Sequence, residues 1–201
     1  SVVKPGFDFT SDGRRALYLA DERADEVVEL FSVDLRSLPG AKLRGAGPLR
    51  VRLNPALVAG GDVREFRLVP GGRRVVYSAD QDVNDFLELY SAPADGSAPP
   101  VRLGTNALDR FGGREFKISA DGERVVYRAA TGILWSVPIG GGVNVRLDTH
   151  VVEHNTSFQL DPRGRRVVFQ SAQAQLYSVP IDGSAAAIPL GQRAASFKIA
   201  A

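Results

Sequence analysis

Residues 66–77 read FRLVPGGRRVVY, and the order of residue types in this stretch decides the fold. An aromatic, a polar and an aliphatic residue lead into a turn that ends at Gly72, and Arg73 and Arg74 then precede two apolar residues and Tyr77. Alternation of apolar and polar residues with a period of two is typical of a β-strand. Glycine at the end of the turn supplies the positive φ that a tight hairpin requires. We therefore expect residues 66–77 to form a β-hairpin.

The same pattern occurs four times in complete form and once in truncated form. The complete copies start at Phe7 (FDFTSDGRRALY), Phe66, Phe116 (FKISADGERVVY) and Phe158 (FQLDPRGRRVVF), and the truncated copy, FKIA, starts at Phe197. Each complete copy places its last aromatic residue 11 positions after its first. Repetition of this kind indicates a repeat architecture. We expect all five phenylalanines to be core residues of inner strands.

Two further strands are expected after each hairpin. The third strands are residues 29–33, 88–92, 134–137 and 176–179, and the fourth strands are 51–53, 101–103, 145–147 and 188–190. Their β-branched and aromatic residues suit a pleated, buried surface. Pro189 replaces the arginine found in the other fourth strands and lacks a backbone N–H, so we expect this strand to be an edge strand.

Four short antiparallel strands in each repeat are the pattern of a β-propeller blade. Successive copies start 39 to 59 residues apart, which is close to the usual blade length. We predict an all-β fold, a β-propeller of four-stranded antiparallel blades with about four blades visible, in which residues 1–201 form a single, partial propeller domain. Five first strands accompany only four sets of the others, so we expect additional blades from the parent chain or another chain to complete a larger ring.

The motifs resemble the TolB-like β-propeller repeat, a relative of WD-repeat propellers. The first turn of that repeat is matched at residues 11–13 and 119–122, and its Leu-Tyr-Ser-Val-Pro-Asp-Gly strand and turn are matched at 89–93 and 176–183. Repeats of this family occur in periplasmic scaffolds, in large secreted repeat proteins and in the gating domain of some serine peptidases. The resemblance thus implies a bacterial protein in a periplasmic or extracellular location.

Composition excludes several classes of protein. The chain has 201 residues with 25 basic and 23 acidic side chains, a net charge of only +2, which gives no indication of a nucleic-acid partner. No apolar run approaches the ~20 residues of a membrane-spanning helix, so no membrane insertion is expected. The absence of cysteine excludes disulfides and thiolate metal sites. The absence of methionine, even at position 1, indicates a processed chain or an excerpt of a longer one.

Charge is distributed unevenly between the two kinds of loop. In an antiparallel blade, the turns between strands one and two lie at one end, and the loops between strands two and three lie at the other. The first kind is basic, with Arg14, Arg15, Arg73, Arg74, Arg124, Arg163, Arg165 and Arg166; the second kind is acidic in the first two copies, with Asp21, Glu22, Asp25, Glu26, Asp80, Asp82 and Asp85. This separation would orient a charged partner. The alternative interpretation is that turns are polar and that the signs arose by drift.

Two groups of residues have the side chains of a metal site. Asp80, Asp82 and Asn84 repeat the beginning of a calcium loop, but the glycine expected at its sixth position is Asp85 and the closing glutamate is absent. Asp148, His150, Glu153 and His154 offer two imidazoles and two carboxylates within one loop. Two histidines four residues apart face the same side only on a helix, and none is expected there. We interpret both groups as polar loop residues and predict no metal and no cofactor.

Nothing in the sequence indicates catalysis. There is no Gly-x-Ser-x-Gly motif, and Ser32, Ser91, Ser136 and Ser178 recur at a structural position of the repeat. We therefore predict no catalytic residues and no enzymatic activity. The function that we favour is a non-catalytic propeller scaffold that binds a protein or peptide partner through its loop end or central channel. The alternatives are a gating propeller domain of a secreted or periplasmic peptidase or hydrolase whose catalytic domain is absent from this chain, and a structural part of a long extracellular repeat protein.

Overall fold

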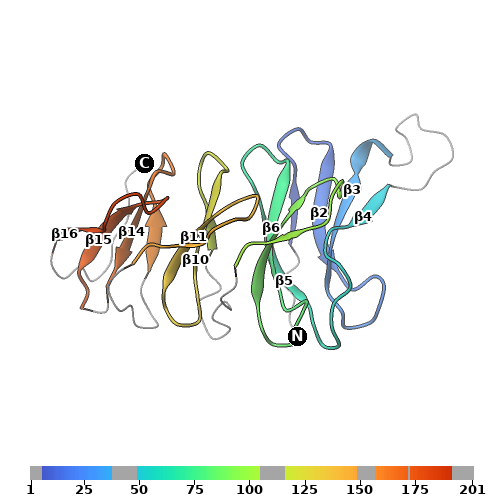
Figure 1. The fold of residues 1–201 in the computed structure, drawn as a ribbon. Helices are drawn as coiled ribbons and strands as arrows, with labels where there is room; N and C mark the ends of the chain where they lie inside the picture. The colour runs from blue at the N-terminus through green and yellow to red at the C-terminus, as the bar shows by residue number, and fades with distance from the viewer. Residues whose placement is uncertain (1–5, 38–48, 105–115, 149–156, 172, 192–201) are drawn as a thin grey trace. The chain divides into compact units, whose positions relative to one another are not determined.

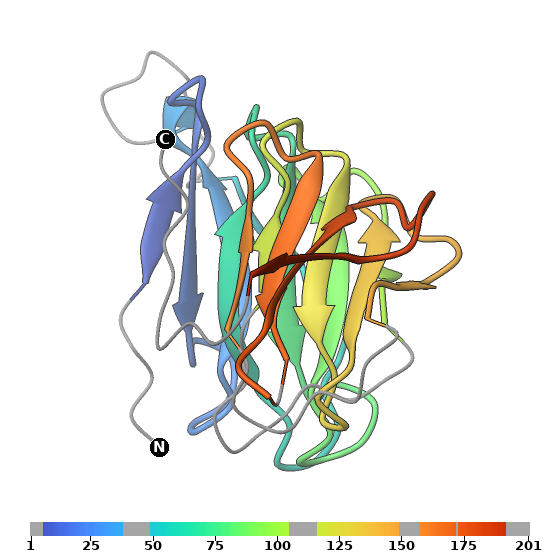
Figure 2. The same ribbon diagram turned by 90° about the vertical axis from the view of Figure 1, so that its left-hand side faces the viewer.

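The computed structural model describes residues 6–37, 49–104, 116–148, 157–171 and 173–191. These residues form four antiparallel sheets of four strands each, with the strands of every sheet in chain order (Figure 1 and, from the side, Figure 2). The one helical element among them is a 3₁₀ turn, η1, at Leu35–Ser37. The predicted all-β fold with four sets of four antiparallel strands is therefore confirmed. None of the described residues belongs to a helix long and apolar enough to cross a membrane.

The strand boundaries follow the repeat closely. The first sheet contains β1 (Phe7–Phe9), β2 (Arg15–Ala20), β3 (Glu29–Asp34) and β4 (Arg50–Arg52), and the second contains β5 (Val63–Leu68), β6 (Arg74–Ala79), β7 (Glu88–Pro93) and β8 (Val101–Arg102). The third sheet contains β9 (Phe116–Ile118), β10 (Arg124–Arg128), β11 (Leu134–Pro138) and β12 (Val145–Arg146), and the fourth contains β13 (Phe158–Leu160), β14 (Arg166–Gln170), β15 (Leu176–Pro180) and β16 (Ile188–Gly191). As predicted, the strand that contains Pro189 lies at a sheet edge.

The first hairpin turn has the same geometry in all four sheets. Gly13, Gly72, Gly122 and Gly164 have φ between 66° and 74°. Each of these glycines donates its N–H to the carbonyl oxygen three residues earlier, over 2.8–2.9 Å. Glycine adopts this left-handed conformation without the steric cost that a Cβ would bring. The predicted turn conformation is therefore confirmed.

The chain divides into two compact units, Ser1–Arg102 and Leu103–Ala201, and each contains two sheets. In the first unit, Leu17 and Leu30 of the first sheet are fully buried against Tyr77 and Tyr90 of the second. An aliphatic face of one sheet thus packs on an aromatic face of the next. The single propeller domain that the sequence suggests for residues 1–201 stays a prediction.

The second unit repeats this packing. Val126 and Leu134 of the third sheet contact Phe158, Phe169 and Tyr177 of the fourth. Phe169 and Tyr177 are stacked with their ring centroids 5.6 Å apart, and Tyr77 and Tyr90 are stacked in the same way at 5.3 Å. The same two faces therefore meet in both units, since residues at equivalent repeat positions supply them.

One part of the core prediction is wrong. Phe116 and Phe158 are fully buried and Phe66 packs partly buried against its core, but Phe7 is 71% exposed. Phe66 and Phe158 lie on sheets whose aromatic face is covered by the preceding sheet of the same unit. Among the described residues of the first unit, no sheet covers β1 on the aromatic face of the first sheet, and Phe7 contacts Phe9 edge to face there. Phe197 lies outside the described residues.

Glycines of the hairpin turns also mark the contact between neighbouring sheets. A Cβ at Gly72 would lie 2.7 Å from the backbone nitrogen of Ser11, and a Cβ at Gly164 would lie 2.6 Å from that of Ala120. In both cases the neighbouring atom belongs to the same turn of the preceding sheet. Gly13 has no such neighbour within 4 Å. The second and fourth sheets therefore approach their predecessors too closely for any side chain at these positions.

Candidate functional site

A groove opens between the first and second sheets, at the end where their hairpin turns lie. It has a volume of about 690 Å³ and is lined by the β1–β2 turn, by η1, by the β5–β6 turn and by the β7–β8 turn. Antiparallel pairing of β2 with β3 and of β6 with β7 brings these connections to one end of the two sheets. Five arginines line the groove: Arg14, Arg15, Arg36, Arg73 and Arg74. We call these five residues and the space between them the basic groove.

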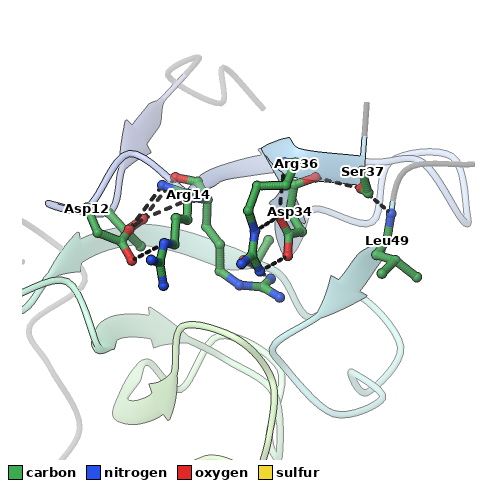
Figure 3. A network of polar contacts seen from close by, with 9 residues as sticks. Asp12, Arg14, Asp34, Arg36, Ser37 and Leu49 are labelled. Carbon is green, nitrogen blue, oxygen red and sulfur yellow. Dashed lines mark hydrogen bonds and ion pairs between the residues drawn. The ribbon is translucent and has the colours of Figure 1, made fainter. Parts of the chain in front are cut away.

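Arg36 is held in place by a carboxylate at the end of β3. Its Nε and Nη2 donate to the two carboxylate oxygens of Asp34, at 3.0 and 2.6 Å, as Figure 3 shows. These bonds hold the pKa of Asp34 well below its ordinary value, so the pair stays ionised over the physiological range. The next residue, Ser37, accepts a bond from the backbone N–H of Leu49 at 2.8 Å and thereby ties η1 to the segment before β4.

Arg14, in the β1–β2 turn of the same sheet, forms a looser ion pair with Asp12. Its Nε lies 3.6 Å from a carboxylate oxygen of Asp12, and both side chains are more than half exposed (Figure 3). Asp12 also accepts the backbone N–H of Arg14 and the hydroxyl of Thr10, and these bonds lower its pKa. An exposed pair of this kind contributes little to stability, so the guanidinium of Arg14 can turn to another anion at small cost.

Arg15 and Arg74 have neutral partners. Each donates to the hydroxyl of a buried serine on β3 or β7, Ser32 at 3.0 Å and Ser91 at 2.9 Å. Partial burial without a carboxylate lowers the pKa of Arg74, because burial disfavours the charged form. The equivalent bonds of the third and fourth sheets are Arg124 to Ser136 at 2.8 Å and Arg166 to Ser178 at 2.7 Å. The arginine–serine pair is therefore a feature of the repeat.

Arg73 has no partner at all among the described residues. It is exposed, lines the basic groove, and makes no side-chain hydrogen bond or ion pair there. The acidic groups that line the groove are Asp12 and Asp95. Asp95 accepts bonds from its own turn, including the N–H of Ser97 at 3.0 Å, which lower its pKa. Asp34 balances Arg36, and the other four guanidinium groups face two carboxylates that already have donors, so the groove is positively charged and Arg73 offers a free cation.

The corresponding place in the second unit differs in charge. Glu123 occupies the repeat position of Arg14, and Asp182 occupies that of Asp95. Hydrogen bonds from Ser184 and, to a smaller extent, the charge of Arg124 lower the pKa of Asp182. The excess of arginine is thus specific to the basic groove and does not follow from the repeat alone.

The acidic loops lie at the opposite end of the first and second sheets, as the charge pattern predicted. Asp80, the first residue of the calcium-like sequence, is fully buried. One of its oxygens accepts the N–H of Asp62 at 2.6 Å, and the other accepts the N–H of Asp85 at 3.0 Å and Arg64 at 3.4 Å. Asp82 accepts the hydroxyl of Tyr90 at 3.0 Å. Asp80 therefore organises its loop through hydrogen bonds, and no group of three or more metal-ligating side chains occurs among the described residues.

The second metal candidate cannot be placed as a set. His150, Glu153 and His154 lie outside the described residues. Asp148 is described and fully buried, and its carboxylate accepts the backbone N–H of Leu134 at 3.1 Å and Nε of Arg146 at 3.0 Å. Burial raises its pKa above the ordinary value. Its role in the described part of the chain is to hold the start of β11.

Sequence reasoning identified most of the basic groove but missed two of its members. The basic hairpin turns predicted Arg14, Arg15, Arg73 and Arg74 at one end of the sheets. Arg36 and Asp95 were missed because they lie in connections between third and fourth strands, which the charge pattern did not include. The signal for Arg36 was present in Asp34-Leu35-Arg36, where opposite charges two residues apart follow a predicted strand.

Comparison with known proteins adds no family: no protein-family model and no curated protein matches the chain.

Proposed function

We propose that the chain is a non-catalytic binding module of the β-propeller kind, whose basic groove binds an acidic segment of a protein partner. Four-stranded antiparallel sheets in chain order, each packed face to face on the next within its unit, are what propeller blades have, and this supports the propeller assignment. The observation that carries the function is the groove itself, where five arginines outnumber the three carboxylates beside them, Asp12, Asp34 and Asp95, all of which already have donors.

The shape and chemistry of the basic groove fit a peptide carboxylate. A volume of about 690 Å³ is within the range of small-ligand and peptide sites. Guanidinium groups match carboxylates in geometry, with two parallel N–H donors for two oxygens. Arg73 can accept such a contact without giving up another, and Arg36 is already oriented by Asp34. An acidic peptide would therefore find one fixed donor and one free donor across the groove.

A peptide is favoured over a nucleic acid on the lining residues. Proteins that bind single-stranded nucleic acid combine positive charge with exposed aromatic rings on which bases stack. The described lining of the groove contains no aromatic side chain. The groove thus offers charge recognition without a stacking surface.

The test is a direct binding measurement at low salt, in which the fluorescence anisotropy of a labelled hexaglutamate peptide reports its binding. We expect saturable binding that Arg73→Ala weakens roughly three- to tenfold, as the loss of one charge-assisted contact of about 1 kcal/mol would do. Arg14→Glu, which copies the residue at position 123, should weaken it further. Added salt should weaken binding because the groups involved are exposed.

Arg23→Ala is the matched control for Arg73→Ala. Arg23 is also exposed and makes no side-chain hydrogen bond or ion pair with described residues, but it lies in the β2–β3 loop, at the other end of the first sheet. The two variants have the same net charge, so an equal loss in both would contradict a site at the groove. Failure of hexaglutamate to bind, or tighter binding of a single-stranded oligonucleotide than of the peptide, would also overturn the proposal.

A further inference from the structure

The aromatic face of the first sheet is open along β1, whereas Phe31 of β3, on the same face, is buried and stacks on Tyr18 at 5.8 Å. Phe7 is 71% exposed and Phe9 is 51% exposed, and the two rings contact each other edge to face at 5.7 Å. Phe7 pairs with Tyr18 across β1 and β2, so the three side chains share one face of the sheet. We call Phe7, Phe9 and Tyr18 the open aromatic face. Apolar exposure of this kind on neighbouring residues marks an interaction surface more often than isolated exposed residues do.

The chain itself shows what covers the equivalent face elsewhere. In the second sheet the corresponding face contains Tyr77, which is buried under the aliphatic face of the first sheet. In the fourth sheet it contains Phe158 and Phe169, which are buried under Val126 and Leu134 of the third sheet. In both units, the covering surface is the aliphatic face of a four-stranded sheet.

The fourth sheet has an aliphatic face of the same kind, and this face is partly exposed. Val168 and Leu176 occupy the repeat positions of Val126 and Leu134 and are half-buried, whereas Val126 and Leu134 are fully buried. Leu190 is 53% exposed, while its equivalent Leu147 is 2% exposed. The aliphatic face of the fourth sheet, which we define as Val168, Leu176 and Leu190, is therefore the counterpart of the open aromatic face.

The hairpin turn of the first sheet leaves room for the same contact. Gly72 and Gly164 lie against the backbone of the preceding sheet's turn, but Gly13, at the same repeat position, has free space around it. Glycine is present at position 13 with the conformation that the close approach requires. The first sheet thus has both the exposed face and the glycine turn that would allow another sheet to pack on it.

We propose that the aliphatic face of the fourth sheet of a second copy of this chain packs on the open aromatic face. The contact joins two different surfaces, so each copy presents one of each. Two copies that exchange the contact reciprocally form a closed dimer, and copies that do not close form longer oligomers. A second copy is the occupant that we choose because the chain supplies the complementary face with the same residue types that form the contact inside both of its units.

The experiment is sedimentation of the complete 201-residue chain over a wide range of concentration. We expect the mass to rise from the 21.6 kDa of one chain to at least twice that value. Phe7→Ser with Phe9→Ser should abolish the rise, and so should Leu190→Asp. These residues are exposed, so both variants should keep their thermal unfolding transition. Phe86→Ser is the control, since Phe86 is a 42% exposed phenylalanine in the β6–β7 loop and should leave association unchanged.

Mixing the two variants tests whether the contact joins the fourth sheet of one copy to the first sheet of the other. The Phe7→Ser, Phe9→Ser chain keeps an intact fourth sheet, and the Leu190→Asp chain keeps an intact open aromatic face. Each alone should be monomeric, and an equimolar mixture should form a heterodimer with one contact. A wild-type chain that stays monomeric at all concentrations would overturn the proposal. So would a Leu190→Asp chain that still associates, because the aromatic faces would then pair with each other.

Discussion

At the scale of single residues, a neutral and an acidic side chain at the same repeat position accept the same backbone hydrogen bond. Asn54 accepts the backbone N–H of Leu30 at 2.8 Å, and Asp148 accepts that of Leu134 at 3.1 Å. Both follow a fourth strand and hold the beginning of a third strand. Asparagine satisfies the buried N–H without a charge, whereas the aspartate places a carboxylate in a fully buried position.

The burial of Asp148 gives a pH-dependent prediction. Burial raises its pKa in the folded chain above the ordinary 3.8. A raised folded pKa means that the favourable contribution of this group is fully present below about 3.8 and is lost as the pH rises through the folded value. Asp148→Asn keeps the acceptor and removes the titration. We therefore expect the variant to gain stability relative to the wild type as the pH increases from about 4 to about 7.

Urea unfolding of both chains over this pH range measures the difference. The comparison is needed because Asp12, Asp34 and Asp95 have lowered pKa values, so their contributions are lost as the pH falls through their folded values. These groups are common to both chains and cancel in the difference. A difference in unfolding free energy that is independent of pH, or that favours the aspartate more at high pH, would contradict the effect of burial.

At the scale of strands and sheets, position in the array decides the environment of otherwise equivalent residues. Phe116 and Phe7 both begin a first strand, yet Phe116 is fully buried and Phe7 is 71% exposed. The repeat predicted the strands, their order, the hairpin turns and the buried residues Phe116 and Phe158. It could not predict the exposure of Phe7, because burial depends on a neighbouring sheet and the pattern within one repeat contains no information about that neighbour.

We expect the two phenylalanines to differ in their contribution to stability. Phe116→Ala empties a fully buried aromatic site and should lower the unfolding free energy by roughly 3–5 kcal/mol. Phe7→Ala should change it by less than about 1 kcal/mol, as is usual for exposed positions. Chemical unfolding at high dilution, where association is absent, gives both values. Similar losses in the two variants would mean that the aromatic face of the first sheet is covered within a single chain.

The candidate site illustrates what a sequence pattern contains at this scale. Arginine at the start of each second strand and serine in each third strand were both visible as repeated residues. Their hydrogen bond became apparent only from the register, which pairs Arg15 with Asp34 and Arg74 with Pro93 and so makes Ser32 and Ser91 their diagonal neighbours. The basic end of the sheets was predictable because alternate turns of an antiparallel sheet lie at the same end. The groove was not, because it requires two sheets to face each other at a particular distance.

At the scale of the whole molecule, the acidic side chains at one end of the first two sheets have donors from the chain itself. Asp80 is neutralised in part by Arg64 and by backbone N–H donors, and Asp82 is bound by Tyr90. These donors occupy both oxygens of Asp80 and one oxygen of Asp82. The acidic loops of the first unit therefore have an internal explanation in hydrogen bonding.

We accordingly expect a chelator to leave the thermal stability of the chain unchanged. EDTA should not shift the melting temperature, and added calcium should not raise it, because Asp80 already has donors on both oxygens. Differential scanning calorimetry of the complete chain provides the measurement. A fall of several degrees that calcium restores and that Asp82→Ala abolishes would instead identify residues 80–85 as a calcium site.

The close contact of Gly72 with the backbone of Ser11 has a consequence for how such a chain changes over generations. Two demands act on Gly72: its own backbone conformation, and the space taken by the preceding turn. Within the first unit only the first demand acts on Gly13, since nothing lies within 4 Å of a Cβ built there. A sheet that packs on the first sheet would impose the second demand on Gly13 without altering a single nucleotide of its codon. Selection on one repeat is thus set partly by the repeat that precedes it.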